Sequence, residues 1–283
     1  MKVVSFTGVV EKNDIQIQKA CAKLQVKISK KDFTTPFLYD SYRDFLDLKK
    51  GRCTIAVVNN NADDVICMQV PLYMLFEFAQ WHEGLIREEM VGDVVNFNAG
   101  NPYTASNKIS SFEITGHIDL TGAGNVYLAN NGYLKVDFHD LDPSWTVEVN
   151  TVEMATYAPT FYHYNNQFQS ADVTQRGIEN KEGIMFIAQH AQLKELRCSF
   201  ANGSTCNYTK EELINIMFDT NDVVRVRKAL ILPNETFHGT DKLLIEEIAT
   251  CDKMDILTEP SLTAQYWIVE ARRNYEEPKV ATK

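Results

Sequence analysis

The feature that most limits how this chain can fold is a module that occurs twice. Its first copy reads as strand (CTIAVV), Asn-rich turn (NNNADD), strand (VICMQV) and then a helix that opens at Pro71, a favoured first-turn residue. The second copy has the same order in ELRCSFA, NGS and TCNY, followed by a helix that opens at Lys210. Pro71 and Lys210 are 139 positions apart in a chain of 283 residues. A unit that recurs at half the chain length indicates a tandem duplication.

Most of the remaining sequence has the period-2 alternation of half-buried antiparallel strands. Apolar residues alternate with polar ones through Leu24–Ile28, Ile114–Leu120, Leu134–Phe138 and Trp145–Val149, and again in AQYWIVEA near the end. A β-rich unit of roughly 120 to 160 residues, with one helix between its strands and no parallel βαβ rhythm, is typical of a jelly roll or a related sandwich. The sequence therefore predicts an all-β protein with a few helices, built as two tandem jelly-roll barrels. Two different β-rich domains are the alternative.

Each module has a helix with its own signature. The segment after Pro71 is apolar on two sides, which predicts a largely buried helix. The segment TKEE begins with Thr209 and has Glu212 three residues later, which is the pattern of a capping box.

Charge divides the chain into a basic start and an acidic body. The formal net charge is −10, yet residues 1–31 hold seven lysines against Glu11 and Asp14, a local charge of +5. We therefore expect a basic N-terminal arm in residues 1–31, a first barrel in 32–160 and a second barrel in 161–283. Such an arm suits an anionic partner such as lipid headgroups or nucleic acid, and a solvated basic face is the alternative.

The six cysteines lack CxxC spacing. Cys53 and Cys67 flank the first repeated hairpin, and Cys198 and Cys206 flank the second. Facing positions across a hairpin suit a cross-strand pair or zinc, but the spacings are unlike common zinc motifs, so buried free thiols are the favoured interpretation. The start of the chain has no long apolar run and no small-residue cleavage site, which predicts synthesis in the cytoplasm, where thiols stay reduced.

The segment LANNGYLKVDFHDLD, residues 128–142, combines a turn with a group of acids. Its Asn-Asn-Gly run is typical of a tight hairpin, and Leu134, Val136 and Phe138 then face a core. The acids Asp137, Asp140 and Asp142, with His139, are the hard oxygen ligands that calcium prefers. They lack the glycine and the terminal glutamate of an EF-hand loop, so an ordinary loop at a barrel rim is favoured and no metal site is predicted.

No enzyme motif accompanies this scaffold. The sequence contains no Gly-x-Ser-x-Gly, no Walker A motif and no GxGxxG. A bicupin-like metalloenzyme shares the double-barrel architecture, but the His-x-His pair that holds its metal is missing from both halves; His117 and His139 are the residues to test as ligands. We expect no catalytic, cofactor-binding or metal-binding residues and no cofactor.

An aromatic stretch, YAPTFYHYNNQF at residues 157–168, is a candidate binding surface because aromatic rings stack on bases or sugars. It holds no Lys or Arg, which disfavours nucleic acid. A strand that packs the two barrels together explains the stretch equally well.

The segments NVYLANNGYLKVDF, WTVEVNTVE, LKELRCSFANGSTCNYTKEELINIMF and LTAQYWIVEARRN carry a family resemblance. The chain has two jelly-roll-sized halves, each with a helix between strands. In this architecture it resembles the double jelly-roll major capsid proteins of tailless, membrane-containing icosahedral bacteriophages. The resemblance is one of architecture over nearly the whole chain.

That resemblance implies a non-enzymatic structural subunit that trimerises into pseudo-hexagonal capsomers of an icosahedral shell. It implies neighbouring capsomers and other capsid or penton proteins as partners, and internal membrane lipids near the Lys-rich arm. No specific nucleic acid is expected, and the location is the virion after synthesis in the host cytoplasm. A viral spike, or a carbohydrate- or receptor-binding β-sandwich, is the alternative function, and a bicupin-like enzyme is a third.

Overall fold

Two compact units make up the chain. The computed structural model describes residues 1–30, 37–38, 51–59, 62–83, 94–95, 108–109, 112–169, 175–179, 183–189, 192–213, 243–247, 251–260 and 264–274. Unit 1 comprises Met1–Ala79, Ile86–Phe161 and Arg273–Lys283, and unit 2 comprises Gln80–Leu85 and Tyr162–Arg272. The longer segment of unit 2 begins at Tyr162.

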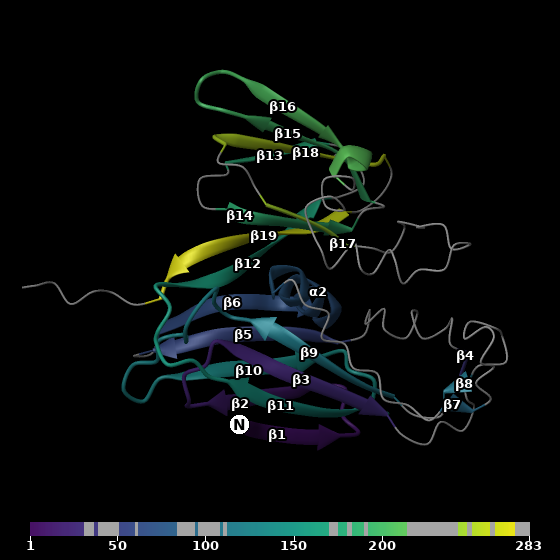
Figure 1. Ribbon diagram of the computed structural model, residues 1–283, viewed down its shortest axis with the longest axis vertical. Helices are drawn as coiled ribbons and strands as arrows, with labels where there is room; N and C mark the ends of the chain where they lie inside the picture. The colour runs from purple at the N-terminus through teal and green to yellow at the C-terminus, as the bar shows by residue number, and fades with distance from the viewer. Residues whose placement is uncertain are drawn as a thin grey trace, which may run out of the picture. The chain divides into compact units, whose positions relative to one another are not determined.

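Among the described residues, unit 1 contains eight main strands in two hydrogen-bonded runs (Figure 1). They are β1 (Lys2–Thr7), β2 (Lys12–Ile17), β3 (Lys23–Lys30), β5 (Arg52–Asn59), β6 (Ala62–Pro71), β9 (Phe112–Asp119), β10 (Tyr133–His139) and β11 (Thr146–Val152). One run has the order β1-β11-β3-β9, and the other has the order β2-β10-β5-β6. The short strands β4 (Phe37–Leu38), β7 (Val94–Val95) and β8 (Lys108–Ile109) form a small separate sheet.

The described part of unit 2 contains eight strands as well. They are β12 (Thr160–Gln169), β13 (Gln175–Glu179), β14 (Gly183–Gln189), β15 (Leu193–Ser199), β16 (Thr205–Thr209), β17 (Leu243–Glu247), β18 (Lys253–Thr258) and β19 (Ala264–Arg273). Here the two runs are β12-β19-β14-β17 and β13-β18-β15-β16.

The two units share one strand order. Numbered from one to eight along the chain of each unit, without the three short strands, the runs read 1-8-3-6 and 2-7-4-5 in unit 1 and again in unit 2. Eight antiparallel strands in two facing sheets, with successive strands alternating between the sheets except for the hairpin of strands 4 and 5, are the pattern of a jelly roll. The predicted double jelly roll is therefore confirmed by topology.

Each pair of runs encloses an apolar core. In unit 1, Phe6 on β1 meets Phe138 on β10 across the sheets, with ring centroids 5.9 Å apart. In β10, Leu134, Val136 and Phe138 are fully buried, as their alternation predicts. The core cluster of unit 2 draws on both of its runs: it includes Leu196 on β15, Ile256 on β18 and Tyr266 and Ile268 on β19.

The first predicted helix is α2 (Leu72–Glu83), which follows β6 directly. The side chains of Leu72, Met74, Leu75, Phe76 and Phe78 are all buried, as the two-sided apolar pattern predicts. Phe76 fills the space over Gly116 on β9, where an added Cβ would lie 2.3 Å from the ring. A glycine at this strand position therefore lets the helix seat its aromatic ring against the sheet. No helix of the described residues is long and apolar enough to cross a membrane.

Residues 1–30 correct one expectation. They hold β1, β2 and β3, three strands inside unit 1, where a separate basic arm was expected. In β3, Leu24, Val26 and Ile28 are fully buried while the residues between them are partly exposed. The charged residues lie on the outer face of such a strand, whereas its alternating apolar residues pack against the core.

The Asn-Asn-Gly run corrects a second expectation, that of a hairpin at this turn. Asn131 has φ 65° and the Gly132 amide donates to the Ala129 carbonyl over 2.8 Å, so the tight turn is present. The strands before and after it, β9 and β10, lie in different runs, and β10 pairs with β2 and β5. The turn therefore ends a loop between sheets and does not join a hairpin.

Candidate functional site

The acids after the turn lie in a row but do not converge. Asp137, on β10, accepts a hydrogen bond from the backbone amide of Asp14 over 2.7 Å. His139, two residues later, has its Nε2 3.4 Å from the Thr54 hydroxyl. Each of these side chains therefore ties β10 to a neighbouring strand or turn.

Asp140 and Asp142 lie in the loop after β10, as predicted for a barrel rim. Asp140 pairs with Arg52 over 3.4 Å and has φ 55°. Asp142 accepts hydrogen bonds from the amide and the hydroxyl of Ser144, over 2.9 and 2.6 Å, which is ordinary Asx-turn chemistry. Their carboxylates hold the loop in shape.

The described residues contain no group of three or more His, Cys, Asp or Glu side chains placed to hold a metal ion. The two histidines named as test ligands, His117 and His139, lie on β9 and β10, which belong to different runs. His117 is buried, with its Nε2 3.3 Å from the Gln25 amide nitrogen. The structure thus does not bring the bicupin-type ligands together.

The aromatic stretch is mostly core. Phe161, Tyr162 and Tyr164 are buried, whereas Tyr157 is 52% exposed. Tyr157 meets Tyr127, which is 37% exposed, edge to face with ring centroids 5.6 Å apart. Among the residues of this region whose burial is described, the aromatic rings most exposed to solvent are therefore this tyrosine pair, and its second member was not singled out by the sequence.

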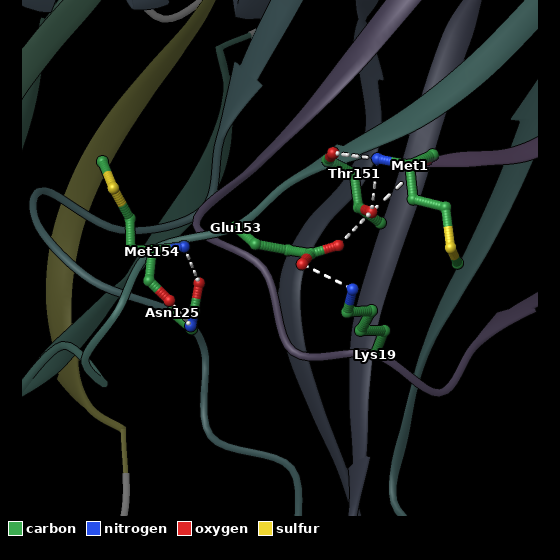
Figure 2. A network of polar contacts seen from close by, with 6 residues as sticks. All are labelled: Met1, Lys19, Asn125, Thr151, Glu153 and Met154. Atoms are coloured by element: carbon green, nitrogen blue, oxygen red, sulfur yellow. Dashed lines mark hydrogen bonds and ion pairs between the residues drawn. The ribbon is translucent and has the colours of Figure 1, made fainter.

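Asn125 holds the two loops that carry this tyrosine pair. Its side chain donates to the Met154 carbonyl and accepts from the Met154 amide, both over 2.8 Å (Figure 2). Its backbone amide donates to the Thr156 carbonyl over 2.7 Å, and its carbonyl accepts from the Ala158 amide over 2.9 Å. Four hydrogen bonds from one residue give this rim of unit 1 a defined shape.

Asn274, from a distant part of the sequence, forms hydrogen bonds to the same two loops as Asn125. Its side-chain oxygen accepts from the Tyr127 amide over 2.7 Å, and its Nδ2 donates to the carbonyls of Asn125 and Ala158 over 2.9 and 2.6 Å. Sequence reasoning missed both asparagines, because the contacts join positions 149 and 116 residues apart and leave no local pattern.

The lysines of the first strands are engaged with acids. Figure 2 shows Lys19 paired with Glu153 over 2.5 Å, and Glu153 also accepts from the Thr151 hydroxyl over 3.1 Å. The bond from Lys19 is the main reason why the pKa of Glu153 is lowered. Lys2 pairs with Glu148, and Lys23 with the buried Asp119 over 3.2 Å. The local excess of positive charge is therefore partly neutralised inside unit 1.

The cysteines differ between the units. All six are free, five are buried and Cys206 is exposed, which agrees with the predicted free, mostly buried thiols. Cys198 and Cys206 are directly opposite each other in the β15–β16 register. Cys53 and Cys67 are offset, because Cys53 faces Val70 and Cys67 faces Ile55.

The chain was compared with known protein families, curated proteins and solved structures. No protein-family model matches the sequence, and no curated protein matches it. The fold is similar to the major capsid protein P2 of bacteriophage PM2, with a TM-score of 0.41 and 11% identity over 98% of this chain and 96% of that chain. It is also similar to a chain of the Sputnik virophage structure solved by cryo-EM, with a TM-score of 0.35 and 9% identity over 96% and 84% of the two chains.

Proposed function

We propose that this chain is a major capsid protein, a structural subunit of an icosahedral virus shell. The observation that carries the proposal is the strand order 1-8-3-6 and 2-7-4-5, present twice in one chain. Three copies of a chain with two like barrels supply six like barrels, which is what a pseudo-hexagonal capsomer needs. A homotrimer is therefore the assembly that suits the duplication.

The jelly roll also suits a structural role in the wall of a shell. Two packed sheets make a rigid wall, and the strand edges stay short, so the barrels resist uncontrolled edge-to-edge association. Contacts between subunits would then form through loops at the barrel rims, such as the loops held by Asn125 and by Asp142. Obligate interfaces of this kind are large and partly apolar.

The remaining features of the proposal follow from the same role. The protein acts without catalysis, is made in the host cytoplasm and ends in the virion beside neighbouring capsomers and other capsid or penton proteins. Contact with internal membrane lipids is proposed for the Lys-rich first strands. Because Lys2, Lys19 and Lys23 have carboxylate partners, we expect this contact to be weak and sensitive to salt.

Size-exclusion chromatography with light scattering, followed by electron microscopy, tests the proposal. We expect a particle close to three times the chain mass of 32.2 kDa, with a six-lobed outline. A monomer that persists at every concentration and never joins a shell, alone or with other virion proteins, would contradict it. Vesicles of anionic and of neutral lipid, at low and at high salt, test the lipid contact separately.

Receptor or carbohydrate binding is the second candidate, favoured by the exposed pair Tyr127 and Tyr157. Exposed aromatic edges and faces suit stacking against sugar rings. Substitution Tyr157→Ala should abolish glycan-array binding and leave the thermal melting curve unchanged, whereas buried Tyr164→Ala should lower the melting temperature. If Tyr157→Ala has no effect on any ligand that the wild type binds, this candidate fails.

A further inference from the structure

Two cysteines of unit 2 face each other across a hairpin. In the β15–β16 register, Cys198 is the direct partner of Cys206, between the pairs Arg197–Asn207 and Ser199–Thr205. Direct partners on antiparallel strands project their side chains to the same face of the sheet. Their Cα atoms are typically about 4.5–5.5 Å apart, within the range of about 4.4–6.8 Å that disulfides span.

The two thiols differ in access to solvent. Cys206 is exposed, and β16 is the last strand of its run among the described residues. Cys198 is 3% exposed and belongs to the apolar core of unit 2. One thiol can thus meet a soluble reagent while its partner cannot.

A third cysteine lies beside the buried one. The Asp252 amide donates to the Ser199 carbonyl over 2.8 Å, which places Cys251 next to the end of β15. Cys198 and Cys251 both belong to the apolar core of unit 2. Burial, and then Cys251, raise the pKa of Cys198 to about 12. Cys198 is therefore protonated and slow to react at neutral pH.

The corresponding hairpin of unit 1 provides an internal contrast. Cys53 and Cys67, on β5 and β6, are both fully buried. Their positions are offset in the register, and the Cys67 thiol donates to the Cys53 carbonyl over 3.6 Å. Burial raises the pKa of Cys53 well above its ordinary value. No exposed thiol leads to this pair.

We propose that Cys198 and Cys206 are a redox-responsive pair, in which a low-molecular-weight disulfide such as oxidised glutathione enters at Cys206 and leaves a cross-strand disulfide between β15 and β16. The pair stands on the geometry of unit 2 and does not depend on the proposed function. A capsid subunit would meet such oxidants on leaving the reducing cytoplasm.

The chemistry is two thiol–disulfide exchanges. The Cys206 thiolate attacks one sulfur of oxidised glutathione, the S–S bond breaks, and one glutathione leaves as a thiolate that takes up a proton. Cys198 then loses its proton, and its sulfur attacks the Cys206 sulfur of the mixed disulfide and displaces the second glutathione. Two protein thiols are oxidised and one oxidised glutathione becomes two reduced ones. Because the second step needs the Cys198 thiolate, it should be slow and should accelerate as pH rises.

Peptide mapping tests the pair directly. Trypsin cleavage after Arg197 and Lys210 releases CSFANGSTCNYTK, which contains both cysteines. The folded protein is incubated with oxidised glutathione, quenched with acid and alkylated, and the peptide is followed by mass spectrometry. We expect its internally bridged form, two hydrogens lighter than the dithiol, to accumulate after a transient glutathione adduct. Dithiothreitol should reverse the bridge.

Single variants separate the steps. Cys206→Ser, at an exposed position, should fold normally and lose at least 10-fold in the rate of Cys198 oxidation. Cys198→Ala should stop at a stable glutathione adduct on Cys206. The proposal is overturned if the wild type stops at that adduct, or if a link between Cys198 and Cys251 forms as fast in Cys206→Ser as the bridge forms in the wild type. Cys53 and Cys67 should stay reduced in every folded sample.

Discussion

The hairpin of strands 4 and 5 is built differently in the two barrels. In unit 1 it is β5–β6, and its second strand has Ile66, Cys67 and Val70 fully buried, although Met68 is 59% exposed. In unit 2 it is β15–β16, and every residue of β16 is exposed except Tyr208, which is partly buried. The same place in the strand order is therefore occupied by a partly buried strand in unit 1 and by a largely exposed strand in unit 2.

The strand register also differs between the two hairpins. The β5–β6 ladder shifts twice, on each side of Ile55, and Gln69 on β6 has φ 48°. The β15–β16 ladder runs without a shift into a tight turn in which Gly203 has φ 81°. Strand order survives such differences because it depends on the connections between strands, whereas register and burial depend on the side chains of each copy. The two units thus share their topology and differ in the packing of this hairpin.

Side-chain truncation in the fifth strand of each unit, β6 in unit 1 and β16 in unit 2, should give the largest difference in stability between the two hairpins. Ile66→Ala on β6 removes a fully buried side chain and should cost about 2–5 kcal/mol of unfolding free energy. Asn207→Ala on β16 changes an exposed side chain and should stay within about 0.5 kcal/mol. Urea denaturation of both variants, followed by far-UV circular dichroism, measures the two values. Equal losses would show that β16 is as deeply packed as β6.

A glycine of unit 1 gives the next largest effect. In Gly116→Ala the new methyl group would lie 2.3–2.5 Å from ring atoms of Phe76, so α2 or β9 must shift. Overpacking of this kind costs about 1–3 kcal/mol. Combining Gly116→Ala with Phe76→Leu should recover part of the loss, as a coupling measured in a double-mutant cycle. Strictly additive losses would mean that the ring and the glycine do not share this space.

The sequence indicated the fold through features that act over short distances. The alternation through Leu134–Phe138 and the apolar pattern after Pro71 each describe one element and its buried side, and both predictions are confirmed. The Asn131 turn was equally local, but whether a turn joins a hairpin depends on where the next strand pairs. That choice is made by the whole sheet, so the hairpin prediction was wrong.

The candidate surfaces were harder to predict for the same reason. The stretch at 157–164 signalled aromatic residues, but only the fold shows that Tyr164 is core and that Tyr157 meets Tyr127. The hydrogen bonds of Asn274 join residues from distant parts of the sequence. Local composition likewise overstated the basic arm, because Lys23 lies in a strand beside Asp119. Long-range pairing is information that one sequence does not display.

The two helices that follow these hairpins also start differently, and this gives a smaller effect. The predicted capping box is present in unit 2: the Thr209 amide donates to Glu212 over 2.8 Å, and the Glu212 amide donates to the Thr209 hydroxyl over 3.3 Å. The first turn of α2 contains no acidic residue. Thr209→Ala should therefore cost about 0.5–2 kcal/mol.

Thermal and urea unfolding measure this cost, with exposed Glu211→Gln as the matched control on the same turn. Thr209→Ser keeps the hydroxyl and should retain most of the stability. If Thr209→Ala and Glu211→Gln behave alike, the reciprocal bonds do not stabilise the helix start.

Two surface ion pairs should give the smallest difference, and pH makes it measurable. Lys2 on β1 pairs with Glu148 on β11, so the contact joins two strands, whereas Arg197 pairs with Glu195 on the same strand β15. The Lys2 bond is the main cause of the lowered pKa of Glu148. A carboxyl with a lowered pKa in the folded state adds stability above its ordinary value of 4.5, and this stability is lost as pH falls through the folded-state pKa.

Lys2→Ala should therefore cost less than about 1 kcal/mol near neutral pH, and the gap to the wild type should close as pH falls below about 4.5. The Arg197 bond likewise lowers the pKa of Glu195, so Arg197→Ala should also lose some stability near neutral pH, but less than Lys2→Ala because its contact stays within one strand. Urea unfolding from pH 3 to 7 in low salt, about 10 mM, measures both variants. A Lys2→Ala gap that persists in acid would attribute the loss to packing of the lysine stem, and an equal loss in Arg197→Ala would show that cross-strand placement gives no advantage.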